Sequence, residues 1–151
     1  MVEVVRPPLT LDPVAAAVST ARRYVAEALA ACGASRFESS AELGVSELVT
    51  NAVLHGRTEL TVTVVTTRNG GVRIEVTDGS PLPPQQRRLS VLATTGRGLR
   101  LVASVSSDWG VRAVRTRWGQ GKTVWFEPVE EPTAEAFADA DWAAEIEALR
   151  G

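Results

Sequence analysis

The residues best suited to chemistry lie in one short stretch, SELVTNAVLHG at 46–56, in which Glu47, Asn51 and His55 recur every four positions. That spacing places side chains on one side of an α-helix, with Cβ atoms about 5–6 Å apart. A carboxamide oxygen is a hard, neutral ligand for Mg²⁺, and a carboxylate one turn away can accept a proton from a hydroxyl that attacks a phosphate. The pattern predicts a magnesium- and phosphate-directed helix face. By itself, it also fits an amphipathic helix with solvated polar side chains.

The helix that carries this stretch is expected to run from about Arg36 to Gly56. Ser35 and Glu38 have the spacing of a capping box at its start. His55 is the only histidine, so we expect a hydrogen-bonding role at the helix end and no histidine metal site. The side opposite Glu47 forms an apolar arc. Its members are Ala41, Val45, Leu48, Val49, Ala52 and Val53.

A second candidate site follows a predicted strand, where Asp78 precedes Gly79. A carboxylate at this place can accept a hydrogen bond from an exocyclic amine and so select adenine. The alternative is an Asp-Gly turn with no ligand, which is common. Thr123, on the last predicted strand, is expected to point its hydroxyl toward Asp78, unless it is an ordinary strand threonine.

A glycine motif, Gly96-Arg97-Gly98, stands directly before a short predicted helix that begins at Leu99. Glycines let a backbone approach a ligand closely, and the free N–H groups at a helix start favour an anion such as phosphate. Arg97 can add a charge-assisted hydrogen bond. The alternative is a glycine hinge beside a surface arginine. A second glycine sequence, GKT at 121–123, lacks the upstream glycine of a Walker loop and continues into a strand.

The remaining sequence predicts the elements that must position these residues. An edge strand is expected within residues 2–11, because two prolines there are poorly tolerated in a central strand. Asp12-Pro13 is a helix-start signal, and Gly33 ends that helix. Alternating aliphatic residues predict two further strands, joined at Asn69-Gly70 by a type I′ turn. A surface loop, the short helix and a last hairpin, at 109–117 and 123–127, complete an α/β fold of the α+β type, a two-layer sandwich.

Composition favours one domain, at 1–128, followed by an acidic tail, at 129–151. The chain has 151 residues, of which 44% are hydrophobic, and a net charge of −2. The tail is predicted to be helical and holds seven acidic side chains against one arginine, so the rest is mildly basic. That suits a phosphate-bearing ligand but falls short of a nucleic-acid surface. No apolar run long enough for a membrane span, no signal-peptide pattern and a lone Cys32 predict a cytoplasmic protein.

The order of these motifs resembles the GHKL ATPases, which share the Bergerat ATP-binding fold: a mixed, mostly antiparallel sheet covered on one face by helices. Within that family, the chain is most similar to the small anti-sigma-factor serine/threonine protein kinases. The resemblance spans residues 8–127. SELVTNAVLHG is very close to the first family box, and GRGLRLV at 96–102 matches the glycine box. The middle box, Asp-x-Gly-x-Gly in the family, reads DGSPL at 78–82 and lacks the later glycines.

The resemblance implies a site for Mg²⁺-ATP between the motif helix and a lid formed by residues 80–95. Asn51 would hold Mg²⁺ on the phosphates, and Glu47 would be the base that activates a serine hydroxyl. Asp78 and Gly79, with Thr123, would bind the adenine amine. The phosphates would lie against the glycine box, Gly96, Arg97, Gly98 and Leu99.

Implied partners are a STAS-type anti-anti-sigma protein, as the phosphorylated substrate, and a sigma factor that the kinase sequesters, with the kinase as a homodimer. Neither nucleic acid nor membrane is expected as a direct partner. One alternative is a catalytically weak or inactive adaptor that keeps the fold and binds proteins. Another is a histidine-kinase catalytic domain, which is less favoured because no helix with a phosphoacceptor histidine precedes the ATP-binding region.

Overall fold

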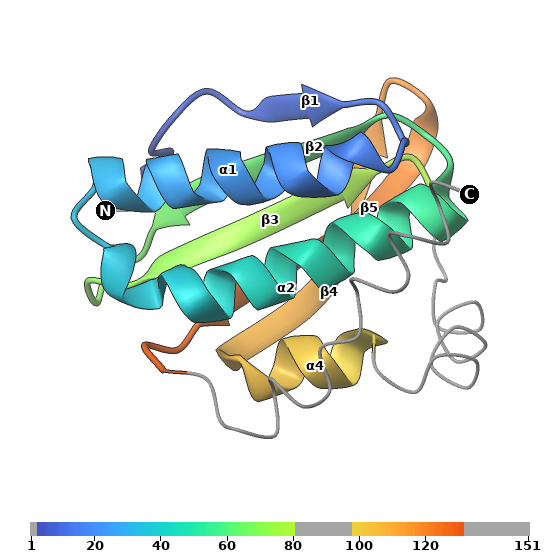
Figure 1. Cartoon of the computed structure of the whole chain (residues 1–151). Helices are drawn as coiled ribbons and strands as arrows, with labels where there is room; N and C mark the ends of the chain where they lie inside the picture. Colours follow the sequence, from blue (N-terminus) through green and yellow to red (C-terminus); the bar gives the residue numbers. More distant parts are fainter. Residues whose placement is uncertain (1–2, 81–97, 132–151) are drawn as a thin grey trace.

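The computed structural model describes residues 3–80 and 98–131, which form two layers (Figure 1). The helical elements are α1 (Ala16–Ala31), a 3₁₀ turn η1 (Ser35–Phe37), α2 (Glu38–Asn51), a π-helical turn η2 (Ala52–Gly56) and α4 (Gly98–Ser104). The strands are β1 (Leu9–Leu11), β2 (Leu60–Thr66), β3 (Val72–Asp78), β4 (Ser106–Thr116) and β5 (Gly119–Pro128). Among these residues, no helix combines the length and apolar character needed to cross a bilayer.

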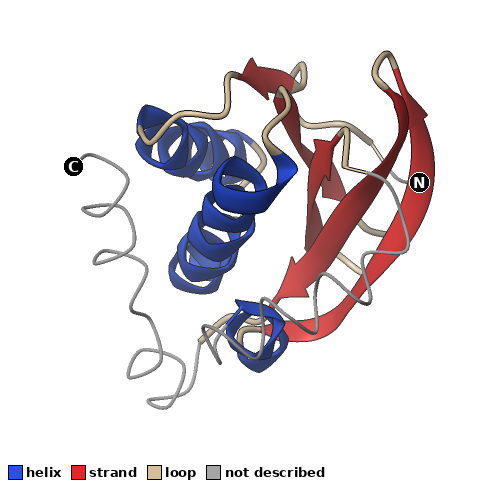
Figure 2. Ribbon diagram, turned by 90° about the vertical axis from the view of Figure 1, so that its right-hand side faces the viewer, coloured by secondary structure: helices blue, strands red, loops and turns tan. Residues whose placement is uncertain are grey.

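The five strands form one sheet in the order β1-β2-β3-β5-β4, and every neighbouring pair is antiparallel. The described helices lie on one face of the sheet (Figure 2). The predicted two-layer α/β architecture is therefore confirmed. The sheet is purely antiparallel within the described residues, which is simpler than the mixed sheet that the resemblance implied.

The two faces of the sheet follow from the period of two residues along each strand. In β3, Val72, Ile74 and Val76 are almost fully buried against the helices, and the residues between them are only partly buried. The same alternation runs through β2 and places Val124 and Phe126 of β5 on the helix-facing side. Even-numbered positions of β3 and β5 thus point to the helical layer.

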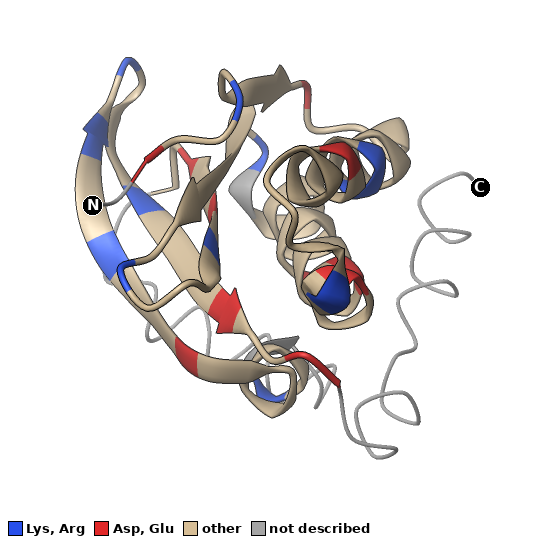
Figure 3. Ribbon diagram, turned by 90° about the vertical axis from the view of Figure 1, so that its left-hand side faces the viewer, with Lys and Arg blue, Asp and Glu red and all other residues tan. Residues whose placement is uncertain are grey.

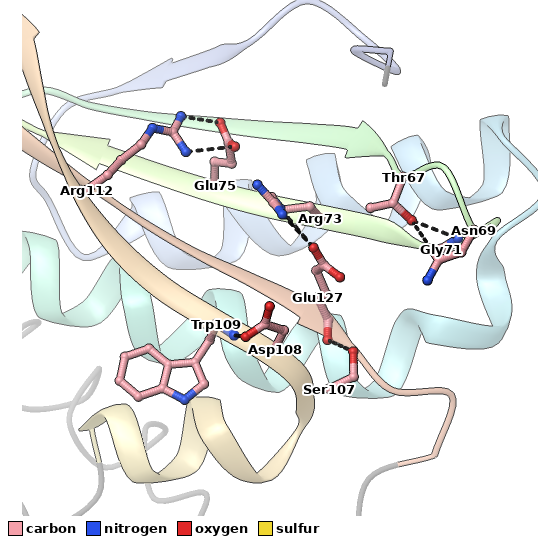
Figure 4. Close-up of polar contacts among 10 residues, drawn as sticks. All are labelled: Thr67, Asn69, Gly71, Arg73, Glu75, Ser107, Asp108, Trp109, Arg112 and Glu127. Atoms are coloured by element: carbon pink, nitrogen blue, oxygen red, sulfur yellow. Dashed lines mark hydrogen bonds and ion pairs between the residues drawn. The ribbon is translucent and has the colours of Figure 1, made fainter. Parts of the chain in front are cut away.

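The opposite face of the sheet is held by polar cross-strand contacts (Figure 4). Arg73 Nη2 lies 2.7 Å from Glu127 Oε2, and the guanidinium stacks 4.1 Å from the centre of the Trp125 ring. Arg112 pairs with Glu75 at 3.3 Å and ties β4 to β3. Arginines continue along β4 toward the β4–β5 hairpin (Figure 3). This face needs no helical cover, because its side chains are solvated or paired.

Helix α2 lies at the centre of the helical layer, between α1, α4 and the sheet. All its residues from Leu43 to Thr50 are buried, which argues against the alternative of an amphipathic helix with solvated polar side chains. Gly44 allows this close approach: a Cβ built there would overlap the Phe126 ring. The polar residues Ser46, Glu47 and Thr50 are therefore enclosed within the fold.

The ends of the helices differ from the predictions in detail. The motif helix begins and ends near the predicted residues, but as η1, α2 and η2 in succession, and Arg57 at φ 56° terminates it. Neither η1 nor α2 has a side-chain cap, so the capping box of Ser35 and Glu38 is not formed. Helix α1 starts at Ala16, after the Asp12-Pro13 signal, again without a side-chain cap.

The β2–β3 hairpin forms where Asn69-Gly70 predicted it, but with a longer loop. The N–H of Thr67 donates to the Gly71 carbonyl at 2.9 Å, and only Gly70 takes a positive φ, of 83°. A type I′ turn needs positive φ at both central positions, so that turn type is wrong. The acidic tail beyond residue 131 lies outside the described residues.

Replacing Gly44 by alanine is expected to lower the free energy of unfolding by about 1–3 kcal/mol, the usual cost of overpacking a core. The new methyl group would meet the Phe126 ring, which is fully buried and cannot move aside. Urea denaturation measures the effect, with the exposed Ser39→Ala on the same helix as control. A Phe126→Leu background should reduce the penalty of Gly44→Ala; equal penalties in both backgrounds would contradict this contact.

Tyr24 makes stability depend on alkaline pH. Its hydroxyl donates to the Pro7 carbonyl at 2.9 Å, and burial raises the pKa of Tyr24 above its ordinary 10.0, against a smaller lowering by the Arg6 charge. The folded protein therefore holds this proton more tightly than the unfolded chain. The contribution is fully present below about pH 10 and is lost as pH rises through the folded pKa. The free energy of unfolding, measured from pH 8 to 12, should fall less steeply in Tyr24→Phe, because this variant has no phenol to titrate.

Candidate nucleotide site

The C-terminal half of α2 and the end of β3 lie at the same end of the molecule. Helix α2 and strand β3 run in the same direction (Figure 1). Gly44 packs on Phe126, which pairs with Ile74 in the middle of the sheet. From there Asn51 is about 10 Å further along the helix, and Asp78 is about 13 Å further along the strand. The motif helix and the adenine-directed aspartate therefore reach the same end of the layer.

Glu47 and Asn51 differ in their exposure. Glu47 is 1% exposed, so its carboxylate is shielded from bulk water. Charges interact more strongly in such an enclosed place than they do in water. Asn51, at the last position of α2, is only partly buried. The described residues contain no cluster of three His, Cys, Asp or Glu side chains for a metal. The carboxamide oxygen of Asn51 alone still fits Mg²⁺, because this ion commonly takes one or two protein ligands and completes its shell with water and phosphate oxygens.

Asp78 is buried and already engaged by the protein. Lys122 Nζ lies 2.9 Å from both carboxylate oxygens, and the N–H of Ser80 donates to Oδ1 at 2.8 Å. The Asp78 side chain is 5% exposed and that of Lys122 14%. Asp78 thus forms the local turn and a largely buried ion pair. Among the described residues, Oδ2 accepts only from Lys122, so it keeps capacity for the amine of a purine.

Sheet register explains why Lys122, and not Thr123, lies beside Asp78. Asp78 is opposite Lys122 on the helix-facing side, whereas Thr77 is opposite Thr123 on the other face. The Thr123 hydroxyl lies 2.6 Å from that of Thr77. The prediction that Thr123 points toward Asp78 is therefore wrong. The sequence contained the signal, because alternation back from Val124 assigns Lys122 to the buried face.

The turn after β3 is held by neighbouring segments. The N–H of Gly79 donates to Thr58 Oγ1 at 2.7 Å. Gly121 lets β5 pass close to β3, since a Cβ there would overlap the carbonyl oxygen of Asp78. These contacts fix the backbone on both sides of the Asp78 carboxylate. A missing glycine at position 80 therefore does not leave this turn unsupported.

The glycine box is only partly described. Gly96 and Arg97, together with nearly all of the predicted lid at 80–95, lie outside the described residues. Gly98 and Leu99 open helix α4, which packs against α2 and β4. The backbone thus brings the described part of this box, from Gly98 onward, next to the motif helix. His55 is exposed in η2.

The fold is an antiparallel sheet with helices on one face. A buried glutamate, an asparagine and an aspartate lie toward one end of it. Together these features define an ATPase domain of GHKL type. The sequence pattern of the histidine kinase-like ATPase domain matches residues 11–127, and the chain belongs to this family. A search of curated proteins gave no match. ATP is accordingly the expected ligand.

Replacing Asp78 by asparagine is expected to weaken ATP binding by at least about tenfold, because a charged acceptor is lost. Calorimetry with Mg²⁺-ATP measures the affinity. Thr123→Val is the matched control: the residue is adjacent to Lys122 but on the other face of the sheet, so ATP affinity should not change. An equal loss in both variants would contradict the assignment of the two faces.

Proposed function

We propose that this chain is a regulatory serine/threonine protein kinase of the anti-sigma-factor type, dependent on ATP and Mg²⁺. It would phosphorylate a serine of a STAS-type anti-anti-sigma protein, sequester a sigma factor, and so regulate transcription from the cytoplasm as a homodimer. The observation that carries the proposal is Glu47, a carboxylate with 1% exposure, one helical turn before the partly buried Asn51. A general base for a protein hydroxyl has to be shielded from water and close to the metal ligand.

The roles follow from that arrangement. Asn51 would hold Mg²⁺, whose charge offsets that of the phosphates. Glu47 accepts the proton of the serine hydroxyl while the serine oxygen bonds to the γ-phosphorus. The bond from that phosphorus to the bridging oxygen breaks, and ADP leaves with the electron pair. Phosphoryl transfer depends mainly on position and charge neutralisation, so one carboxylate and one metal ligand are sufficient protein groups.

Glu47→Gln should retain ATP binding and lose phosphorylation of the partner serine, with a fall in rate of about 10²–10⁴. The measurement is transfer of labelled phosphate to the anti-anti-sigma protein, beside calorimetry with ATP. Glu38→Gln is the matched control, because Glu38 is an exposed carboxylate in the first turn of the same helix. Transfer at the original rate in Glu47→Gln would remove Glu47 from this role.

A protein-binding adaptor without turnover is the second candidate. One observation favours it: the Asp78 carboxylate already accepts hydrogen bonds from Lys122 and from the backbone of Ser80. If these bonds exclude the adenine ring from Asp78, calorimetry should detect no binding of ATP at millimolar concentration, while the protein still binds its partner. Bound ATP together with serine labelling would exclude the adaptor.

A further inference from the structure

Lys122 is a largely buried charged residue that the proposed mechanism leaves unused. It is the only lysine of the chain, and its Nζ lies 2.9 Å from both oxygens of Asp78. Both side chains are largely buried, so solvent and salt screen this pair weakly. The carboxylate expected to contact the base is therefore one half of an ion pair rather than a lone anion.

The pair still has hydrogen-bonding capacity. Asp78 Oδ1 accepts from Ser80 N–H and from Lys122, whereas Oδ2 accepts only from Lys122 within the described chain. A carboxylate oxygen has two lone pairs, and an ammonium group has three N–H bonds. One acceptor position on Asp78 and one donor on Lys122 therefore remain next to each other.

We propose that Lys122 broadens the base selectivity of this site, so that 6-oxopurine nucleotides, those of inosine and guanosine, bind as well as ATP. This rests on the proposed placement of the purine at Asp78. Adenine presents an amine donor at N6 beside an acceptor at N1. Hypoxanthine and guanine present a donor at N1 beside an acceptor at O6. Each edge offers one donor and one acceptor in neighbouring positions, but in opposite order. Adenine would place its N6 amine on Asp78 and N1 toward Lys122, whereas a 6-oxopurine, shifted by one position within the site, would place N1–H on Asp78 and O6 toward Lys122.

An aspartate without the lysine would discriminate strongly. The O6 oxygen of a 6-oxopurine would then face an anion and have no donor, and a buried acceptor left without a partner is costly. Adenine would lose less, because its amine still donates to the carboxylate. Lys122 thus acts mainly by removing the penalty on the 6-oxo group. A hydrogen-bonding site without such a donor discriminates strictly between 6-amino and 6-oxo purines.

The test compares dissociation constants of ATP, ITP and GTP for the full chain with Mg²⁺, measured by calorimetry. ITP lacks the 2-amino group and isolates the effect of position 6. Wild-type protein should bind ITP within about tenfold of ATP, and Lys122→Met should raise the ITP-to-ATP ratio of dissociation constants by about ten- to a hundredfold. Lys122→Arg keeps the donors and should keep ITP binding, and Thr123→Val, on the opposite face, should leave the ratio unchanged.

Thermal unfolding checks that each variant folds, because Lys122→Met leaves Asp78 without its cation. If that variant does not fold, Lys122→Gln removes the charge, keeps an N–H donor for Asp78 and should give a smaller rise in the ratio. A wild-type protein that binds ATP but rejects ITP, or a ratio unaffected in folded Lys122 variants, would overturn this inference and leave the kinase proposal standing. If no nucleotide binds to the wild-type protein, the proposed function fails as well.

Discussion

The close approach of α2 to the sheet is the constraint on which the rest of the structure depends. Gly44 presents no side chain to the Phe126 ring, so the helix axis can lie close to β5 and β3. One turn later this approach encloses Glu47, and two turns later it brings Asn51 to the helix end. A larger residue at position 44 would lift the helix and open the carboxylate to water. A single contact between core residues thus determines the environment of the proposed general base.

The largely buried pair of Asp78 and Lys122 is explained better by the proposed selectivity than by stability. Removing two charges from water costs several kcal/mol per ion, and their attraction often only offsets that cost. Hydrophobic residues at both positions would serve the core about as well. The two side chains instead lie where β3 ends, on the helix-facing side of the sheet. An energetically neutral pair at that place is explained better by ligand recognition than by folding.

Local sequence patterns predicted the elements, and most of the errors came from tertiary contacts. Alternation in β2 and β3 and the signal at Asn69-Gly70 gave two strands and their hairpin, because these depend on neighbours in sequence. The enclosure of α2 could not be predicted, because α4 and the Phe126 ring of β5, which cover this helix, come much later in the chain. Motif spacing proposed Glu47 and Asn51, and a position after a strand proposed Asp78; their roles stay predictions. Thr123 was proposed because of its hydroxyl, although the period of β5 already placed Lys122 beside Asp78.

Register links the polar face of the sheet to the buried site. Arg73 with Glu127, and Arg112 with Glu75, lock β3, β5 and β4 in one alignment. A slip of one residue would exchange the two faces of a strand. Such a slip in β5 would turn the Lys122 ammonium out and bring the Thr123 hydroxyl to Asp78, so the purine would meet a neutral partner. The ion pairs on the exposed face contribute little stability individually. Their larger effect is to select the alignment in which Asp78 lies opposite a cation.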